Sequence, residues 1–333
     1  MILVVFGHVL LYGYGTIPVA SFQNLFVLFR MPLFFFVSGF LFYKRYEKNP
    51  HPCHTMNMTF LLGKMRVQLV PTAFFLLLNV WLFDASLYET VVTSNKGGYW
   101  FTITLFEFFL SYILVQSIMG LRIGRYFVWI LGVIYILIGM EPFCDIIGRM
   151  GLDFDMLSCI KLRYFVFFCF GTLFREHFSR IEKVFNSSLW MSVSVVTTFL
   201  VCFYLYKFGV NRGVERAVLG GIAGLGGILV VFCFFYRYQK TFEQNTRLGG
   251  FLQYVGKRTL DVYLLHYFFI PRNLGFMNDW FNLYPNPSME FIVSVVLALV
   301  TIVLCLVTSN VIRLSPFLAH WLFGVKYEVH EKK

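Results

Sequence analysis

Residues 29–42, FRMPLFFFVSGFLF, decide the fold class of this chain. The surrounding apolar run extends from about residue 22 to residue 43. A helix needs about 20 apolar residues to cross a bilayer, so the run is long enough. Clustered phenylalanines are an aggregation hazard in water but are ordinary against lipid. The stretch therefore predicts a transmembrane helix that contains one charged residue, Arg30.

The whole chain has the composition of a membrane protein. Of its 333 residues, 58% are hydrophobic and 14% are charged, and the mean hydropathy is +0.71. Soluble domains carry about 25% charged residues. The net charge of +11 is compatible with nucleic-acid binding, but in a membrane protein a basic excess more often marks cytoplasmic loops. We therefore expect contact with membrane lipid and not with nucleic acid.

The apolar runs predict an all-α bundle of about ten transmembrane helices. The predicted spans are 1–13, 22–43, 67–84, 99–119, 126–140, 162–174, 189–208, 217–236, 255–271 and 289–312. Within the eighth span, Gly220 and Gly224 are four residues apart, a spacing typical of a close helix-packing face. No soluble domain interrupts the pattern, so we expect one membrane-embedded domain over residues 1–333.

The distribution of basic residues predicts the orientation. With the N-terminus in the cytoplasm, 19 of the 28 Lys and Arg residues lie in cytoplasmic segments. Both termini are then cytoplasmic, and residues 313–333 form a short basic cytoplasmic tail. The first span is short and lacks the basic flank of a signal peptide. We expect that the chain begins inside an incomplete first helix and that its natural start lies upstream.

Four predicted spans place an Arg, a Glu or a His at membrane depth, where an ionisable side chain costs about 2.5–3.5 kcal/mol. His8 lies in the first span and Arg30 in the second, where Ser38 shares the face of Arg30 two turns later. An arginine does not lose its charge, so Arg30 needs a carboxylate, an anionic ligand or water. Each of the two residues also has a purely structural explanation. His8 would then form a hydrogen bond between helices, and Arg30 would form a structural ion pair.

The other two polar spans carry Glu107 and His266. Trp100 and Glu107 fall on one helical stripe, so Glu107 is expected to accept a proton, to pair with Arg30, or both. Tyr263 and His266 share a face of the ninth span, and Asp261 is expected to pair with Arg258 three residues earlier. Ionisable groups on four spans predict a polar cavity between helices.

One motif contains possible metal ligands, but it has too few of them for a metal site. HPCH at residues 51–54 places two histidines and a cysteine together in a basic loop. Tetrahedral zinc sites need four ligands at suitable spacing, and the chain has no second cluster of this kind. We therefore expect a solvated loop and no metal.

Five stretches carry a resemblance to a known family. They are LVVFGHV (3–9), FRMPLFFFVSGFLF (29–42), GKMRVQLVP (63–71), YWF (99–101) and VGKRTLDVYLLH (255–266). In this order they resemble the acyltransferase-3 family of bacterial integral-membrane O-acyltransferases, over residues 1 to about 312. The resemblance implies transfer of an acyl group, usually acetyl, from cytoplasmic acyl-CoA to a hydroxyl of a cell-envelope or exported glycan. Lipid-linked glycans are among the candidate acceptors. It also implies a location in the inner cell membrane.

The resemblance assigns the catalytic role to His8. The family pattern places a basic residue eleven positions before this histidine, which falls upstream of Met1 in this chain. Acyl transfer needs a base beside the hydroxyl and donors for the oxyanion, and an imidazole titrates near neutral pH. His8 is either this general base or a covalent carrier of the acyl group, and the sequence leaves both open, with the general base preferred.

Basic residues at the cytoplasmic ends of spans are candidates for the phosphates of acyl-CoA. They are Lys64, Arg66, Arg122, Arg125, Lys257 and Arg258. For each of them the general excess of cytoplasmic positive charge is the alternative explanation. A transporter or flippase of a lipid-linked glycan is the rival function, because it too needs a polar cavity between spans. The two halves of the chain show no convincing internal repeat, which disfavours that reading.

Overall fold

The computed structural model describes residues 1–18, 21–47, 54–93, 95–119, 126, 130, 159–209 and 213–325, and these residues form helices and connecting turns without strands. The first part of the chain contains α1 (Ile2–His8), η1 (Val9–Gly13), α2 (Gln23–Glu47), α3 (His54–Lys64), η2 (Met65–Leu69), α4 (Val70–Leu82), α5 (Leu87–Val92), η3 (Lys96–Gly98) and α6 (Trp100–Met119). After residue 158 follow η4 (Cys159–Tyr164), α9 (Phe165–Glu176), α10 (Phe178–Phe185), α11 (Ser188–Lys207), α12 (Gly213–Arg237), η5 (Gln239–Phe242), α13 (Arg247–Lys257), α14 (Thr259–Phe269), α15 (Gly275–Leu283), α16 (Pro287–Ile312) and α17 (Pro316–Phe323).

Several helices begin at residues that the sequence marks as helix starts. The Thr246 hydroxyl accepts from the amide of Gly249 at 2.9 Å, and the Asn286 side chain accepts from the amide of Met289 at 3.0 Å. Pro287 then occupies the first turn of α16, where its missing amide hydrogen costs nothing. These caps satisfy helix amides that otherwise have no partner.

Five helices are long and apolar enough to cross a membrane, as the sequence predicts for their regions. They are Gln23–Tyr43, Met58–Leu82, Ser188–Lys207, Glu215–Arg237 and Pro287–Ile312. The predicted span 126–140 falls almost entirely outside the described residues. The number of ten spans and the location of both termini stay predictions.

Of the four remaining predicted spans, one contains a helix of matching length and three contain shorter helices. The 20-residue α6 (Trp100–Met119) matches the predicted span 99–119, whereas Ile2–Gly13 is an apolar helix below the length of a span and α9 has 12 residues. The predicted span 255–271 is broken at Arg258 into the end of α13 and the 11-residue α14. At about 1.5 Å per residue, α14 covers only part of a bilayer. Residues 261–267 of α14 are all buried, so protein surrounds this short helix.

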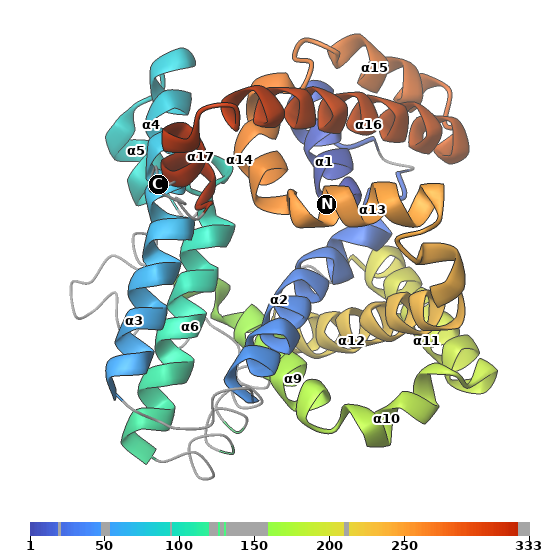
Figure 1. Cartoon of the computed structure of the whole chain (residues 1–333). Coiled ribbons are helices and arrows are strands. Elements are labelled where there is room, and N and C mark those ends of the chain that lie inside the picture. Colours follow the sequence, from blue (N-terminus) through green and yellow to red (C-terminus); the bar gives the residue numbers. More distant parts are fainter. Residues whose placement is uncertain are drawn as a thin grey trace.

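Two clusters of buried side chains divide the described helices. The first, here called the histidine half, is built mainly from α1, α4, α14 and α16. The second, here called the phenylalanine half, is built mainly from α2, α6 and α9, with Ile228 of α12. Figure 1 shows α2 running from the first group of helices into the second.

Glycines let the helices of the phenylalanine half approach closely. A Cβ atom at Gly171 of α9 would overlap the carbonyl oxygen of Phe36 in α2, and one at Gly39 would overlap the carbonyl oxygen of Phe168. Of the predicted glycine pair on α12, Gly224 packs against α2 and α9, but no atom of the described residues lies within 4 Å of a Cβ at Gly220. The predicted face is therefore wrong at Gly220. Gly227, whose Cβ would meet Phe29, completes it instead.

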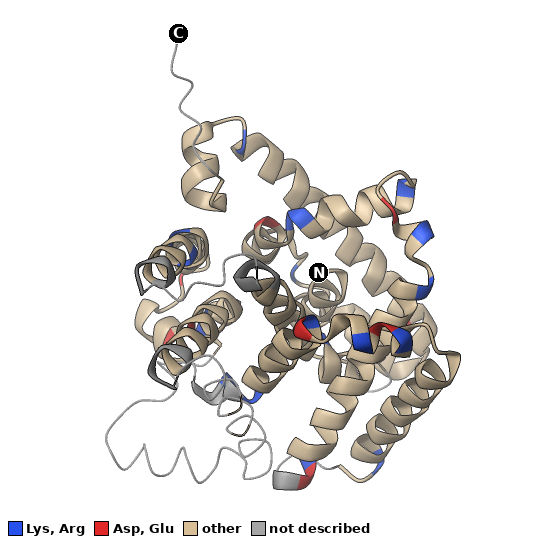
Figure 2. Cartoon of the chain, turned by 60° about the horizontal axis from the view of Figure 1, so that its bottom comes forward, with Lys and Arg blue, Asp and Glu red and all other residues tan. Residues whose placement is uncertain are grey.

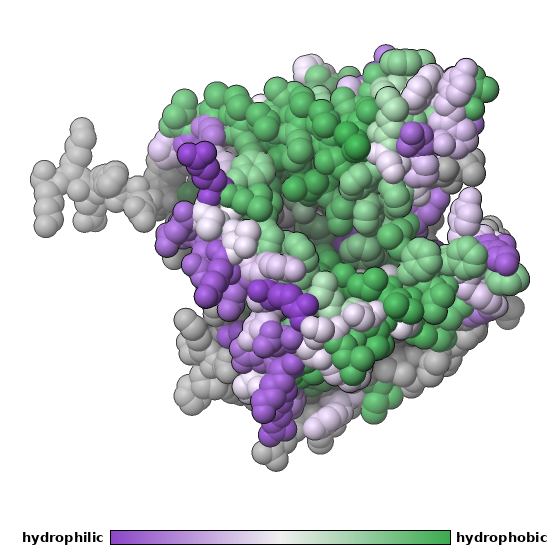
Figure 3. Space-filling model, turned by 90° about the vertical axis from the view of Figure 1, so that its right-hand side faces the viewer, coloured by the Kyte–Doolittle hydropathy of each residue, from purple (hydrophilic) through white to green (hydrophobic). Residues whose placement is uncertain are grey.

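The distribution of polarity agrees with a membrane-embedded bundle. Figure 2 shows that Lys, Arg, Asp and Glu lie mostly at helix ends and in connecting segments. Figure 3 shows a broad hydrophobic zone with hydrophilic side chains gathered at its left and right margins. Exposed Leu, Val and Phe side chains on α11 and α16 contribute large hydrophobic groups to the surface. A surface this apolar is typical of a membrane protein.

Candidate active site

The candidate site is centred on His8, which is the last residue of α1. The chain continues directly into η1, a single π-helical segment over Val9–Gly13. Segments of this kind inside helices are rare and occur often at functional sites. Val5 and Phe6 are fully buried just before His8, so α1 is held firmly in the core of the histidine half.

His266 of α14 meets His8 directly. The Nδ1 atom of His8 lies 2.7 Å from the Nε2 atom of His266. The ring centroids are 4.9 Å apart and the ring planes differ by 11°. The second ring nitrogen of His266, Nδ1, lies 3.0 Å from the carbonyl oxygen of Val262 one turn earlier. Two imidazoles from opposite ends of the sequence thus form one hydrogen-bonded pair.

Tyrosine hydroxyls hold α14 against the segment that precedes α6. The hydroxyls of Tyr263 and Tyr267 both donate to the carbonyl oxygen of Gly98 at 3.0 Å, and the hydroxyl of Tyr99 donates to the carbonyl oxygen of Leu264 at 3.0 Å. Gly98 has a φ of +96°, which favours glycine, and a Cβ there would overlap Tyr267. This close approach fixes the position of the helix that carries His266.

Two aromatic rings beside His8 were not singled out by the sequence analysis. The ring of Tyr267 lies 4.0 Å from that of His266 and 5.2 Å from that of His8, and the ring of Tyr12 lies 5.6 Å from that of His8. Tyr12 is four residues after His8 and Tyr267 directly follows His266. Those spacings indicate that the two tyrosines lie near the histidines, but the signal is weak in a chain with 19 tyrosines.

Arg30 lies beside α1 and does not pair with Glu107. Its Nη1 atom donates to the carbonyl oxygen of Leu3 at 3.1 Å and approaches Oε1 of Gln23 at 3.5 Å. Its Nε atom is buried and has no hydrogen-bond partner among the described residues. A Cβ at Gly7 would overlap the guanidinium, so the missing side chain of Gly7 makes room for Arg30 next to His8. The predicted ion pair is wrong because α2 turns Arg30 toward α1.

The other predicted cavity residues lie in the phenylalanine half. Ser38 donates to the carbonyl oxygen of Phe34 on its own helix at 2.8 Å. The ring of Trp100 packs against Phe35 and Tyr164, with the Lys161 Nζ atom 4.0 Å from its centroid. Glu107 is half-buried on α6.

Within the described part of the chain, neither a hydrogen bond nor a ring contact joins Ser38, Trp100 or Glu107 to the two histidines. The structure therefore brings together His8, Arg30, Tyr263 and His266 of the predicted set, and places these three residues apart from them.

The predicted phosphate-binding residues have different surroundings. Arg122 and Arg125 lie outside the described residues. Lys64 lies 4.9 Å from the ring centroid of Phe109, and the buried Nε atom of Arg66 has no hydrogen-bond partner among the described residues. Lys257 is exposed. None of these contacts assigns a phosphate to any of them.

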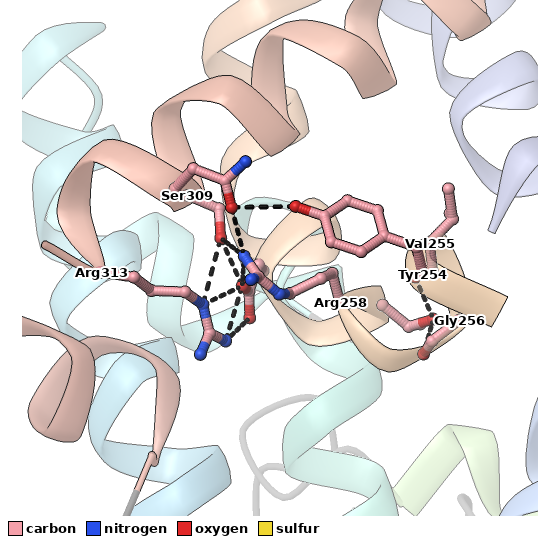
Figure 4. Close-up of polar contacts among 9 residues, drawn as sticks. Tyr254, Val255, Gly256, Arg258, Ser309 and Arg313 are labelled. Carbon is pink, nitrogen blue, oxygen red and sulfur yellow. Dashed lines mark hydrogen bonds and ion pairs between the residues drawn. The ribbon is translucent and has the colours of Figure 1, made fainter. Parts of the chain in front are cut away.

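Arg258 belongs to a polar network between α13, α14 and α16 (Figure 4). It donates to the side chain of Asn310 at 2.8 Å and to Ser309 at 3.1 Å. The buried carboxylate of Asp261 is held mainly by Arg313, through contacts of 2.7 to 3.0 Å, and lies 3.9 Å from Arg258. The predicted pair of Asp261 and Arg258 is therefore only the weaker contact.

A second buried carboxyl group was missed by the sequence analysis. Glu290 of α16 is 1% exposed, and the hydroxyls of Ser21 and Ser294 donate to its two oxygens at 3.0 and 3.1 Å. Tyr14 joins this network through Ser294 at 3.0 Å. Glu290 lies in the first turn of α16, where acidic residues are common because they interact favourably with the helix dipole. Its position in the sequence therefore did not distinguish it from an ordinary residue at a helix start.

Comparison with known proteins identifies the family. The family model described as an acyltransferase domain, of the acyltransferase-3 type, matches residues 1–310. No curated protein and no solved structure matches the chain. Since the matched region covers nearly the whole chain, the protein belongs to the acyltransferase-3 family, as its sequence motifs predict, and this membership together with its apolar helices indicates a multi-pass membrane acyltransferase.

Proposed function

We propose that this protein is an O-acyltransferase of the inner cell membrane that moves an acyl group, usually acetyl, from cytoplasmic acyl-CoA to a hydroxyl of a cell-envelope or exported glycan. The observation that carries the proposal is the hydrogen-bonded pair of His8 and His266 in a chain of the acyltransferase-3 family. A pair of imidazoles, half-buried His8 and fully buried His266, beside an arginine supplies the groups that acyl transfer needs.

In the proposed reaction His8 is the general base. The acceptor hydroxyl loses its proton to His8 while its oxygen attacks the thioester carbonyl carbon. The tetrahedral intermediate then expels the coenzyme A sulfur, which takes the proton from His8. The products are the ester and free coenzyme A, and His8 returns to its starting state. The reaction needs neither a metal nor an oxidant, and it gives no step to Glu107.

Arg30 supports this reaction as a donor for negative charge. Its guanidinium lies against Gly7, directly before His8, and one of its nitrogens, Nε, is buried without a hydrogen-bond partner among the described residues. A preorganised donor aimed at a developing oxyanion is worth about 3 kcal/mol in enzymes where it has been removed. We propose that Arg30 donates a hydrogen bond to the thioester oxygen as negative charge develops on that oxygen.

The donor is expected to enter from the cytoplasmic side. Lys257 and Arg258 lie between α13 and α14, and Lys64 and Arg66 lie where α3 passes into η2 within the helical stretch Met58–Leu82. All four are on the predicted cytoplasmic side, where cations suit the phosphates of acyl-CoA. Arg258 is partly exposed although it already donates to Asn310. The phosphates would then meet positive charge before the thioester reaches the histidines.

The test uses sealed membrane vesicles that contain the full chain, with their cytoplasmic face outward. Acetyl-CoA labelled in the acetyl group is added, and label is followed into the glycan fraction. In parallel, mass spectrometry compares surface glycans of cells with and without the protein. We expect transfer of the acetyl label and ester groups on a glycan. Absence of coenzyme A binding together with movement of an unmodified lipid-linked glycan would instead establish the transporter reading.

A further inference from the structure

We propose that His266 is a positioning residue that holds His8 in one neutral tautomer, with hydrogen on Nδ1 and the lone pair on Nε2. The inference rests on the proposed function, because it concerns the state of the proposed base. It goes further by naming the reacting atom and the residue that selects it. The proposal rests on a chain of hydrogen bonds through four groups: the Val262 carbonyl, the two nitrogens of His266 and the Nδ1 atom of His8.

The direction of the hydrogen bonds follows from the Val262 carbonyl. A carbonyl oxygen only accepts, so the Nδ1 atom of His266, 3.0 Å away, must carry a hydrogen. In a neutral imidazole the other nitrogen then has the lone pair. Nε2 of His266 is therefore an acceptor, and the hydrogen in its 2.7 Å contact must belong to Nδ1 of His8. The lone pair of neutral His8 is thereby assigned to Nε2.

The ring geometry fits a hydrogen bond and not a stack. The two ring nitrogens are 2.7 Å apart, the ring centroids are 4.9 Å apart and the ring planes are nearly parallel. Rings stacked face to face do not have this combination of distances. The two rings instead meet edge to edge, as a linear N–H···N bond requires. His266 is 0% exposed, and Tyr267 packs on both rings, which restricts their rotation.

This arrangement resolves a conflict between catalysis and membrane burial. In serine hydrolases a buried carboxylate fixes the tautomer of the catalytic histidine. A carboxylate inside the membrane is costly. A neutral imidazole accepts the same hydrogen bond without resting charge. When Nε2 of His8 takes a proton, its Nδ1–H becomes a charged donor, and the bond to His266 strengthens as positive charge forms.

The first test compares two variants of His266 in the vesicle assay with labelled acetyl-CoA. His266→Phe keeps an aromatic ring but has no acceptor, whereas the amide oxygen of His266→Gln accepts from Nδ1 of His8. We expect a loss of roughly 10- to 100-fold for the phenylalanine variant and a clearly smaller loss for the glutamine variant. Thr301→Val is the matched control, because Thr301 is buried but donates only within its own helix, to Leu297.

The second test reads the tautomer itself and needs no activity. The full chain with ¹⁵N-labelled histidine is placed in lipid bilayers, and the His8 signals are assigned among the seven histidines by their loss in His8→Ala. We expect a protonated Nδ1 and an unprotonated Nε2 in the parent protein. In His266→Phe the Nε2-protonated form should be populated. His266→Gln should keep the parental pattern.

Two results would overturn the inference. One is a parental His8 with its hydrogen on Nε2, and the other is a folded His266→Phe variant that works at the parental rate while His8→Ala is inactive. Failure of the proposed function looks different: the parent protein would then transfer no acetyl label, and failure of His8 as its base would show as normal transfer by His8→Ala. The nitrogen signals of the parent protein would still decide the tautomer in both cases, and also if His266→Phe failed to fold.

Discussion

The histidine half and the phenylalanine half are packed by different means. In the phenylalanine half, backbones touch: Gly39 and Gly171 let α2 and α9 approach until carbonyl groups fill the space of absent side chains. In the histidine half, side-chain hydroxyls and imidazoles join the helices, as where Tyr263 and Tyr267 share the Gly98 carbonyl. The first arrangement is suited to rigidity, and the second places polar groups where chemistry needs them.

The same small change therefore has different consequences in the two halves. Adding one methyl group at Gly171 confronts a backbone carbonyl, which moves only if a whole helix moves. Adding one methyl group at Gly7 confronts the end of the flexible Arg30 side chain, which is able to move away. We expect the first change to weaken the fold and the second to weaken function.

Gly171→Ala should have the largest effect on stability. The new methyl group forces α2 and α9 apart, and overpacking of this kind costs about 1–3 kcal/mol, with a backbone contact at the upper end. Thermal unfolding of the purified protein in detergent measures the loss. Gly220→Ala is the matched control, because nothing lies within 4 Å of its Cβ and alanine favours a helix. Equal unfolding temperatures for the two variants would contradict the close approach.

Gly7→Ala should leave the protein folded and reduce its activity. Alanine in a helix is more favourable than glycine by about 1 kcal/mol, which offsets part of the cost of moving Arg30. Displacement of the guanidinium should lower the rate of acetyl transfer about tenfold or more. The vesicle assay measures this, with Gly63→Ala as the control because its Cβ has no neighbour within 4 Å. An unchanged rate in Gly7→Ala would remove Arg30 from the reaction.

The two tyrosines that share the Gly98 carbonyl should show the smallest single effects. Tyr267→Phe leaves the carbonyl with one donor and should cost about 1 kcal/mol or less. Tyr263→Phe does the same and also removes the hydroxyl that accepts from the Phe101 amide at 3.1 Å, so it should cost about 1 kcal/mol more. The double variant leaves the buried carbonyl with neither tyrosine donor and should cost more than the sum of the single changes. Unfolding of the three variants measures this coupling. Additive losses would mean that the two hydroxyls act independently.

The sequence predicted the helical class and the two histidines, because polar groups inside apolar spans are visible without tertiary information. It also predicted the family. It did not predict which partners these groups meet. Arg30 was expected to pair with Glu107, yet the rotation of α2 about its axis directs Arg30 to the Leu3 carbonyl. A rotation of this kind is set by packing against neighbouring helices and not by local spacing.

The missed groups show the same limitation. Asp261 was matched to Arg258, which is near in sequence, but Arg313 supplies the shorter contacts from 52 residues away. Glu290 resembles an ordinary residue at a helix start until Ser21, 269 residues earlier, donates to it. Span lengths also depend on tertiary structure, since a helix enclosed by protein, such as α14, does not need the length of a lipid-facing one.

His8 is the proposed base of the acyl-transfer reaction. The most direct measurement is the rate of acetyl transfer from labelled acetyl-CoA in vesicles that contain equal amounts of folded parent protein or His8→Ala. Loss of a general base costs about 10²–10⁴-fold, so we expect a loss of that size without a loss of folded protein. Transfer by a folded His8→Ala variant at the parental rate would contradict the claim and leave His8 as a hydrogen bond between α1 and α14.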